Sequence, residues 1–184
     1  MGRDKALLAY AGETLVQAVA LQVLEAARSV ALLGDPARYG HLGFRVVPDV
    51  VSGCGPMSGL HAALLAAGEA EWILIVACDL PNVKAEFLHR LVEAARLGAS
   101  GVRCVAAQTG CGLEPLCAVY HRTTRTEVEL ALREGRLRMR ELVARLDATG
   151  VDVEPRFVRN VNTEEEWRLH LTEKEQSVNS EASR

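Results

Sequence analysis

Apolar positions along the chain follow two spacings, one typical of helices and one typical of buried strands. Residues 14–27 and 56–68 repeat apolar side chains every three or four positions, which predicts amphipathic helices. Residues 71–79, EWILIVACD, form an unbroken apolar run that predicts a central parallel strand covered on both faces. The same criteria predict further strands at 29–34, 44–49, 101–108, 116–121 and 156–161, and further helices at 83–98, 125–135, 138–150 and 163–171.

The alternation of strands and helices predicts an α/β fold, a three-layer sandwich with a mostly parallel, Rossmann-like sheet. With 184 residues, the chain is expected to form one domain over residues 1–172, followed by a polar, disordered tail at 173–184. Ligands of such sheets bind beyond the carboxyl ends of the strands. The residues that follow each predicted strand are therefore the first candidates for a site.

Composition narrows the classes of function. A net charge of −3 argues against a broad nucleic-acid surface, which would show a basic surplus. No apolar run approaches the ~18 residues of a membrane span. The five cysteines are odd in number and contain no CxxC pair, which indicates reduced thiols rather than a disulfide frame or a zinc site. We therefore expect a cytoplasmic protein with no nucleic-acid or membrane partner.

Asp79 directly follows the long apolar run, at the end of the predicted central strand. A carboxylate held at the edge of a sheet is a natural ligand for Mg²⁺ that bridges phosphates. An aspartate in an Asp-Leu-Pro sequence is also suited to a turn or a helix cap. The residues alone leave both interpretations open.

Three glycines, Gly53, Gly55 and Gly59, lie at the start of the predicted helix at 56–68. Glycines let backbone amides approach a ligand, and a helix N-terminus favours anions. The pattern is also similar to a dinucleotide fingerprint with Asp79 about 20 residues later, although two predicted strands come before it. Close packing of the helix, without any ligand, explains the glycines equally well.

Polar side chains cluster at two later points. Asn160 and Asn162 stand at alternate positions at the end of a predicted strand, so their amides should point to one side; turn or cap chemistry is the alternative. Arginines before a helix can clamp phosphate, although a solvated basic face is the more common explanation. The arginines in question are Arg136, Arg138 and Arg140.

Six segments, taken in order, resemble the molybdenum cofactor guanylyltransferase family, which has the sugar-nucleotidyltransferase-like α/β fold. The resemblance extends from Met1 to about Trp167, and its most specific parts are Asp-Lys-x-Leu-Leu, Gly-Pro-x-x-Gly-Leu and Asn-Val-Asn-Thr. The segments are MGRDKALL, VVPD, GCGPMSGLHAAL, WILIVACDLP, LEPLCAVY and NVNTEEEW.

The resemblance implies a role for each candidate residue. Lys5 and Asp79 would be catalytic, with Lys5 on the nucleotide phosphates and Asp79 binding Mg²⁺. The remaining implied contacts are Asp49 with the guanine or its loop, Gly55 and Gly59 with the nucleotide through their backbone, Asn160 and Asn162 with the pterin, and Arg138 with the pterin phosphate.

The implied reaction is transfer of GMP from MgGTP to the terminal phosphate of molybdopterin, or of its molybdenum form, with release of pyrophosphate. The implied partners are GTP, molybdopterin and other proteins of molybdenum cofactor biosynthesis. Physical reasoning agrees, because the acceptor phosphate is already ionised and needs no strong base. Catalysis then rests on in-line positioning and charge neutralisation.

Members of the family begin with a strand and a Leu-Ala-Gly-Gly-x-Ser-x-Arg loop, whereas this chain starts at the Met-Gly-x-Asp-Lys segment that follows them. The resemblance therefore implies that the first strand, near the middle of the sheet, is missing from the given sequence. We expect a start assigned at an internal methionine rather than a true truncation.

Three alternatives remain. The related molybdopterin cytidylyltransferases would use CTP, although the Gly-Pro-Met-Ser-Gly loop is more similar to the guanylyl branch and Asp49 offers a carboxylate for guanine N1–H and N2–H. The chain could instead be an inactive, N-terminally truncated nucleotidyltransferase-like protein. The glycine pattern leaves an NAD-binding protein as the third alternative.

Overall fold

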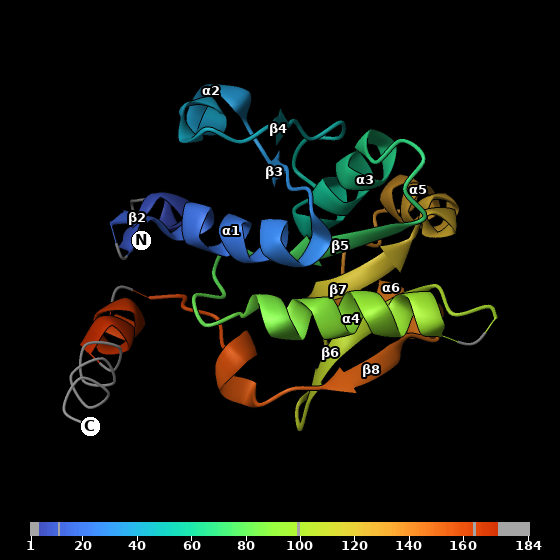
Figure 1. Ribbon diagram of the computed structural model, residues 1–184. Helices are drawn as coiled ribbons and strands as arrows, with labels where there is room; N and C mark the ends of the chain where they lie inside the picture. The colour runs from blue at the N-terminus through green and yellow to red at the C-terminus, as the bar shows by residue number, and fades with distance from the viewer. Residues whose placement is uncertain (1–3, 11, 99, 164, 173–184) are drawn as a thin grey trace.

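The structure, a computed structural model, describes residues 4–10, 12–98, 100–163 and 165–172. A four-stranded sheet of order β5-β7-β6-β8 lies between two layers of helices, with α1 and α4 on one face (Figure 1). The α/β class and the three layers are therefore confirmed. The strands are β5 (Trp72–Val76), β6 (Cys104–Thr109), β7 (Gly112–His121) and β8 (Thr149–Asp152), and the helices of the two layers are α1 (Leu15–Ala27), α4 (Ala85–Leu97), α3 (Pro56–Ala66), α5 (Arg125–Arg133) and α6 (Met139–Arg145).

The prediction of a mostly parallel sheet is wrong, because the sheet is mixed. Strand β7 runs antiparallel to both β5 and β6, and only β6 and β8 pair in parallel within this sheet. Between β6 and β7 the chain has only Gly110 and Cys111, a connection that permits a hairpin but not a crossover. This short turn imposes the antiparallel pairing.

Strand β5 was expected at the centre of the sheet but forms its edge in the described part of the chain. A second, parallel pair, β3 (Leu32–Leu33) with β4 (Val46–Val47), lies on the other side of a cavity of about 560 Å³. We call this cavity the inter-strand groove. Most of the side chains that line it are apolar, and they come from both helix layers and from the sheet, including Val19 of α1, Ala63 of α3 and Leu74 of β5. The prediction of a central parallel strand is wrong because β3 does not close onto β5.

Most predicted helices are confirmed within a few residues. Helix α1 begins after Thr14, whose hydroxyl accepts from the Gln17 amide while the Gln17 side chain accepts from the Thr14 amide. The helix expected at 138–150 ends at Arg145, because the chain turns at Asp147 with a φ of +47°. The following residues form strand β8, which the apolar pattern did not predict.

The strand predicted at 156–161 is wrong. The chain forms a 3-10 helix there, η4 (Pro155–Val158), and residues 165–172 are helical. Proline fixes φ at a helical value and lacks the N–H that a strand would need, so Pro155 favours the first position of a helical turn. Asn160 and Asn162 therefore follow a helical turn rather than a strand.

Several short elements were not predicted. The most relevant to the site are η1 and α2, which precede α1 and follow β3, respectively. The short elements are η1 (Lys5–Leu7), the hairpin of β1 (Ala9–Tyr10) and β2 (Glu13–Thr14), α2 (Pro36–Tyr39), η2 (Gly40–Leu42) and η3 (Arg122–Thr124).

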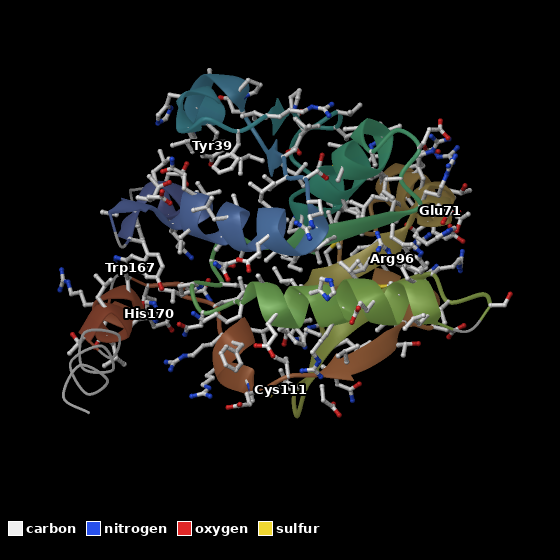
Figure 2. All side chains as sticks on the ribbon, viewed as in Figure 1. Tyr39, Glu71, Arg96, Cys111, Trp167 and His170 are labelled. Carbon is white, nitrogen blue, oxygen red and sulfur yellow. The ribbon has the colours of Figure 1, made fainter. Side chains whose placement is uncertain are left out.

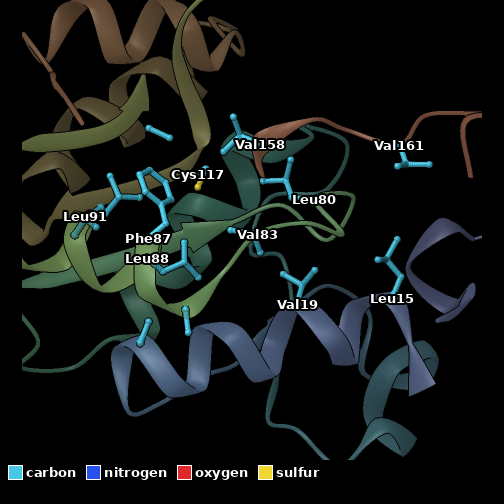
Figure 3. Close-up of a cluster of buried hydrophobic side chains, with 14 of the residues drawn as sticks. Leu15, Val19, Leu80, Val83, Phe87, Leu88, Leu91, Cys117, Val158 and Val161 are labelled. Carbon is cyan, nitrogen blue, oxygen red and sulfur yellow. The ribbon is translucent and has the colours of Figure 1, made fainter. Parts of the chain in front are cut away.

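The largest core cluster fills the space between α1, α4 and the sheet (Figure 3). Leu15 of α1 and Leu88 and Leu91 of α4 are fully buried in it. Val158 and Val161 pack into the same cluster, so the segment that carries both asparagines is fixed to the core. Among the described residues, no helix is both long enough and apolar enough to span a membrane.

The helical residues 165–172 are attached to the N-terminal hairpin through aromatic rings. The centroid of Tyr10 lies 5.5 Å from that of Trp167 and 5.7 Å from that of His170, and both of the latter side chains are labelled in Figure 2. Rings at these separations attract each other through their quadrupoles as well as burying area. The last described segment is therefore held next to the start of the chain. The predicted tail at 173–184 lies outside the described residues.

Candidate active site

Lys5 and Asn162 contact each other although 157 positions separate them. The Lys5 ammonium donates to Asn162 Oδ1 at 3.1 Å. Lys5 begins η1, where Asp4 acts as the cap by accepting from the Ala6 amide at 3.1 Å. The cap fixes the backbone on either side of Lys5, and the buried Ala6 anchors the turn in the protein. The charged start of the chain is thus an ordered loop from Asp4 onward.

Asp79 lies three residues after β5 ends, and its Oδ1 is buried without a hydrogen-bond partner among the described residues. Burial raises the pKa of this carboxyl, and the nearby Lys5 ammonium partly offsets the rise. A buried carboxylate oxygen with no donor is unfavourable unless a cation or a ligand completes it. This oxygen is the clearest unsatisfied acceptor of the candidate site.

The backbone of Asp79 holds the asparagine segment in place. Its carbonyl accepts from the Val161 amide at 3.0 Å, which sets Asn160 and Asn162 on either side of the bond. Glu166 then accepts from the Asn162 amide at 2.6 Å and from the Thr163 amide at 3.1 Å. Glu166 also donates its own amide to the Thr163 hydroxyl at 3.1 Å, so Thr163 and Glu166 form a reciprocal capping box.

The glycines near α3 have different roles. Gly55 adopts a φ of +57° directly before Pro56, a conformation that side chains other than glycine rarely adopt, and it leaves the first turn of α3 accessible. Gly59 lies inside α3, where an added Cβ would be 3.5 Å from Leu33 Cδ1. A Cβ at this distance would make ordinary van der Waals contact, so the packing of α3 on β3 does not by itself require glycine at position 59.

A second cavity, of about 450 Å³, brings together two further candidates, Arg138 and Asn160. Arg138 is the residue before α6 and is well exposed, with one guanidinium nitrogen 3.2 Å from Glu141 Oε1. The lining also includes Arg140, which the sequence grouped with Arg138, and Glu114, which the sequence did not single out. Leu80, the residue after Asp79, lines the same cavity.

Asp49 is exposed in the loop between β4 and α3. Because β3 and β4 are parallel, this loop leaves their sheet at the same edge as the segment that follows β3. The neighbouring Val50 is also exposed, so the loop presents its side chains to solvent rather than to the core.

The sequence did not identify Asp4, Arg38 and Tyr39 as candidates. Tyr39 donates its hydroxyl to Asp4 Oδ2 at 2.8 Å, and Arg38 donates to the same oxygen at 3.2 Å. The Asp35-Pro36 pair, a helix cap followed by a first-turn proline, was a local signal for α2. No local signal could have shown that α2 contacts Asp4.

The residues present fit a magnesium ion bound together with a nucleotide. Asp79 Oδ1 offers one unsatisfied carboxylate oxygen, and Mg²⁺ in nucleotide sites often takes one or two carboxylates and completes its shell with phosphates and water. No group of three His, Cys, Asp or Glu side chains gathers within the described ranges. The chain is therefore suited to share the ion with a phosphate ligand rather than to enclose it.

Comparisons with known proteins identify the family of the chain. The family model described as "MobA-like NTP transferase domain" matches residues 1–149. The chain belongs to this family. A probable molybdenum cofactor guanylyltransferase from Pelotomaculum thermopropionicum is 37% identical over 134 residues, 72% of this chain and 63% of that protein. One from Opitutus terrae is 35% identical over 176 residues, 92% of this chain and 82% of that protein.

A solved structure supports the same fold. The molybdopterin-guanine dinucleotide biosynthesis protein A of Archaeoglobus fulgidus superposes with a TM-score of 0.76 at 22% identity, covering 94% of this chain and 92% of that one. The resemblance found in the sequence is therefore confirmed at the level of family and fold. The family match argues against the NAD-binding alternative, because Gly53, Gly55 and Gly59 lie within the matched nucleotidyltransferase domain.

Proposed function

We propose that the chain transfers a guanylyl group from GTP to the terminal phosphate of molybdopterin and releases pyrophosphate. The observation that carries the proposal is the meeting of Lys5, Asp79 and Asn162 beside the cavity that Arg138 and Asn160 line. A cation, an unsatisfied carboxylate oxygen and amide groups suit a magnesium nucleotide. The names of the two bacterial relatives favour the guanylyl reaction over the cytidylyl one.

The nucleotide would bind between Lys5 and the first turn of α3. Lys5 would neutralise charge on the phosphates, and Gly55, which has no side chain, would let the backbone approach them closely. Asp49 would accept from guanine N1–H and N2–H. Mg²⁺, held by Asp79, would orient the triphosphate and neutralise its charge when bound.

The acceptor would occupy the cavity of about 450 Å³, with Arg138 donating to its terminal phosphate and the amides of Asn160 and Asn162 contacting the pterin. An oxygen of that phosphate attacks the α-phosphorus of GTP, and the bond from this phosphorus to the oxygen bridging to the β-phosphorus breaks. Pyrophosphate carries away the electron pair. The attacking oxygen is already ionised, so the chain needs to position and neutralise charge rather than remove a proton.

The proposal is tested by incubating the purified protein with molybdopterin, Mg²⁺ and either GTP or CTP. We expect a pterin–guanine dinucleotide, identified by mass, together with pyrophosphate, and no product after chelation of the metal. A higher kcat/KM with CTP would replace the guanylyl assignment with the cytidylyl alternative. No product with either nucleotide, from a folded protein, would support the inactive alternative.

A further inference from the structure

The carboxylate of Asp4 uses both of its oxygens to connect two distant segments. Its Oδ1 accepts from the Ala6 amide within the η1 turn. Its Oδ2 accepts from the Tyr39 hydroxyl at 2.8 Å and from Arg38 at 3.2 Å, 35 and 34 positions later. Asp4 thus joins the loop that carries Lys5 to the helix that follows β3.

The position of Tyr39 is itself fixed by its surroundings. Figure 2 shows Tyr39 on the side of α2 that faces α1. Its ring covers Gly34, where an added Cβ would lie only 2.8 Å from Tyr39 Cε2. Asp35 caps α2 by accepting from the Ala37 amide at 2.9 Å, which fixes the start of the helix relative to β3. Tyr39 therefore offers Asp4 a donor from a well-ordered element.

Tyr39 is the stronger of the two partners. The Arg38 side chain is 58% exposed, whereas that of Asp4 is 22% exposed, and an ion pair to a solvated guanidinium contributes little. Burial raises the pKa of the Tyr39 hydroxyl, so the hydroxyl stays protonated at neutral pH and can donate. The hydrogen bond from Tyr39 is partly shielded from water and restricts Asp4 more than the ion pair does.

The side chains of Asp4 and Lys5 contact partners in different parts of the fold. Asp4 binds α2, after β3, while Lys5 binds Asn162, next to the backbone of Asp79. We propose that Asp4 is a positioning residue that, through Tyr39, holds Lys5 against Asn162. As a deepening of the proposed function, this contact also aligns the Lys5 ammonium with the nucleotide phosphates.

We call the connection from Tyr39 through Asp4 to Lys5 the tether. It is tested without any substrate by labelling amines. The Lys5 ammonium is hydrogen-bonded to Asn162, whereas Lys84 is exposed. The acetylation rate of Lys5 divided by that of Lys84 is measured by peptide mass spectrometry. This ratio is low when Lys5 is held against Asn162 and rises when that contact is lost. We expect this ratio to rise by about tenfold in Tyr39→Phe, on the scale of losing one hydrogen bond to a charged group. Arg122→Met, which removes an exposed ion pair with Glu69 elsewhere, is the matched control and should not change it.

Asp4→Asn separates the two roles of the carboxylate. Asparagine keeps one acceptor oxygen and has an NH2 donor in place of the other, so it cannot accept from both the Ala6 amide and the Tyr39 hydroxyl in the same way. The ratio should therefore rise again, and Asp4→Ala should raise it further. An unchanged ratio in both Tyr39→Phe and Asp4→Ala, with circular dichroism as in the wild type, would overturn the tether.

Kinetics then test the alignment. If Lys5 is aligned on the phosphates through this tether, Tyr39→Phe should lower kcat by about tenfold while the KM for GTP changes less than twofold. Wild-type kcat together with faster labelling would overturn the alignment but leave the tether. A wild-type protein with no activity would contradict the proposed function, whereas the labelling result would still decide the tether.

Discussion

Lys5 Nζ lies 3.1 Å from Asn162 Oδ1, so the first described turn of the chain contacts the segment before its last described helix. The Asn162 amide in turn donates to Glu166, and the Val161 amide donates to the Asp79 carbonyl. A lysine held in this way loses little conformational freedom when it binds an anion. If Lys5 binds the nucleotide phosphates as proposed, this contact holds its ammonium in place before the nucleotide arrives.

Removal of the lysine charge should affect turnover far more than stability. We expect Lys5→Met to lower kcat/KM for GTP by at least about 100-fold, the size reported for one donor to a developing charge, with little change in the free energy of unfolding. Lys84→Met is the matched control, since Lys84 precedes α4 and lies outside the site. A loss of kcat/KM in Lys5→Met no greater than that in Lys84→Met, measured by steady-state kinetics, would exclude Lys5 from the chemistry.

Asp79 should reduce stability in the free protein and be required for activity. Because Oδ1 is buried without a donor and burial raises the pKa of the carboxyl, ionisation is unfavourable in the folded state. We expect Asp79→Asn to raise the free energy of unfolding by roughly 1 kcal/mol at neutral pH, as often happens when a functional strain is removed.

The same variant should lose the response to metal. MgGTP should raise the Tm of the wild type and not that of Asp79→Asn, because binding to the folded state alone is stabilising. Asp152→Asn, at the end of β8, is the control and should keep the response. An equal shift of Tm in Asp79→Asn and the wild type would rule out Asp79 as the metal ligand.

Glu166 should titrate below the ordinary glutamate value. The Asn162 and Thr163 amides donate to its carboxylate and lower its pKa from 4.5. Because the folded pKa is depressed, the stabilising contribution is present above the unfolded pKa and is lost as the pH falls through the folded pKa.

Two measurements check this titration. Carbon NMR should give a midpoint below 4.5 for Glu166, identified by its absence in Glu166→Gln. The difference in the free energy of unfolding between the two proteins should shrink as the pH falls through that midpoint. A midpoint at or above 4.5 would show that the capping interaction does not persist in solution.

Arg138 should act on the acceptor rather than on the nucleotide. It lines the cavity of about 450 Å³ with Asn160, and its side chain is 84% exposed. We expect Arg138→Ala to raise the KM for molybdopterin by about tenfold, as for one charged contact to phosphate, and to leave the KM for GTP unchanged. Arg125→Ala, on α5, is the control for loss of a surface arginine. An effect on GTP alone would place Arg138 on the nucleotide side.

The inter-strand groove should bind apolar dyes. Most of its lining side chains are apolar, and the edge of β5 that faces it is unpaired in the described part of the chain. We expect anilinonaphthalene sulfonate to fluoresce with the protein, and Ala66→Arg, which puts a charge into the groove, to reduce the signal. Leu97→Lys, at an 85% exposed position on α4, is the control and should leave it unchanged. An equal loss of fluorescence in both variants would show that the dye binds the protein surface in general rather than the groove.

The sequence by itself determined the elements whose signals are local. The three-to-four spacing located α1, and the sequence also predicted the helix at 163–171, of which residues 165–171 are helical. The motifs also gave the family and the list of candidate residues, because the spacing of Lys5, Asp79 and Asn162 along the chain is itself characteristic. The signals for the helices depend on neighbouring residues, and their physical causes act over one or two helical turns.

Only the tertiary structure decided how these parts meet. The apolar run of β5 fits a central or an edge strand equally well, and its place depends on where β3 and β7 lie. The pairing of Lys5 with Asn162, and of Asp4 with Tyr39, joins residues far apart in the chain. Such contacts come from the packing of the helices on the sheet, which fixes distant segments together once the core is buried, and no local pattern specifies them.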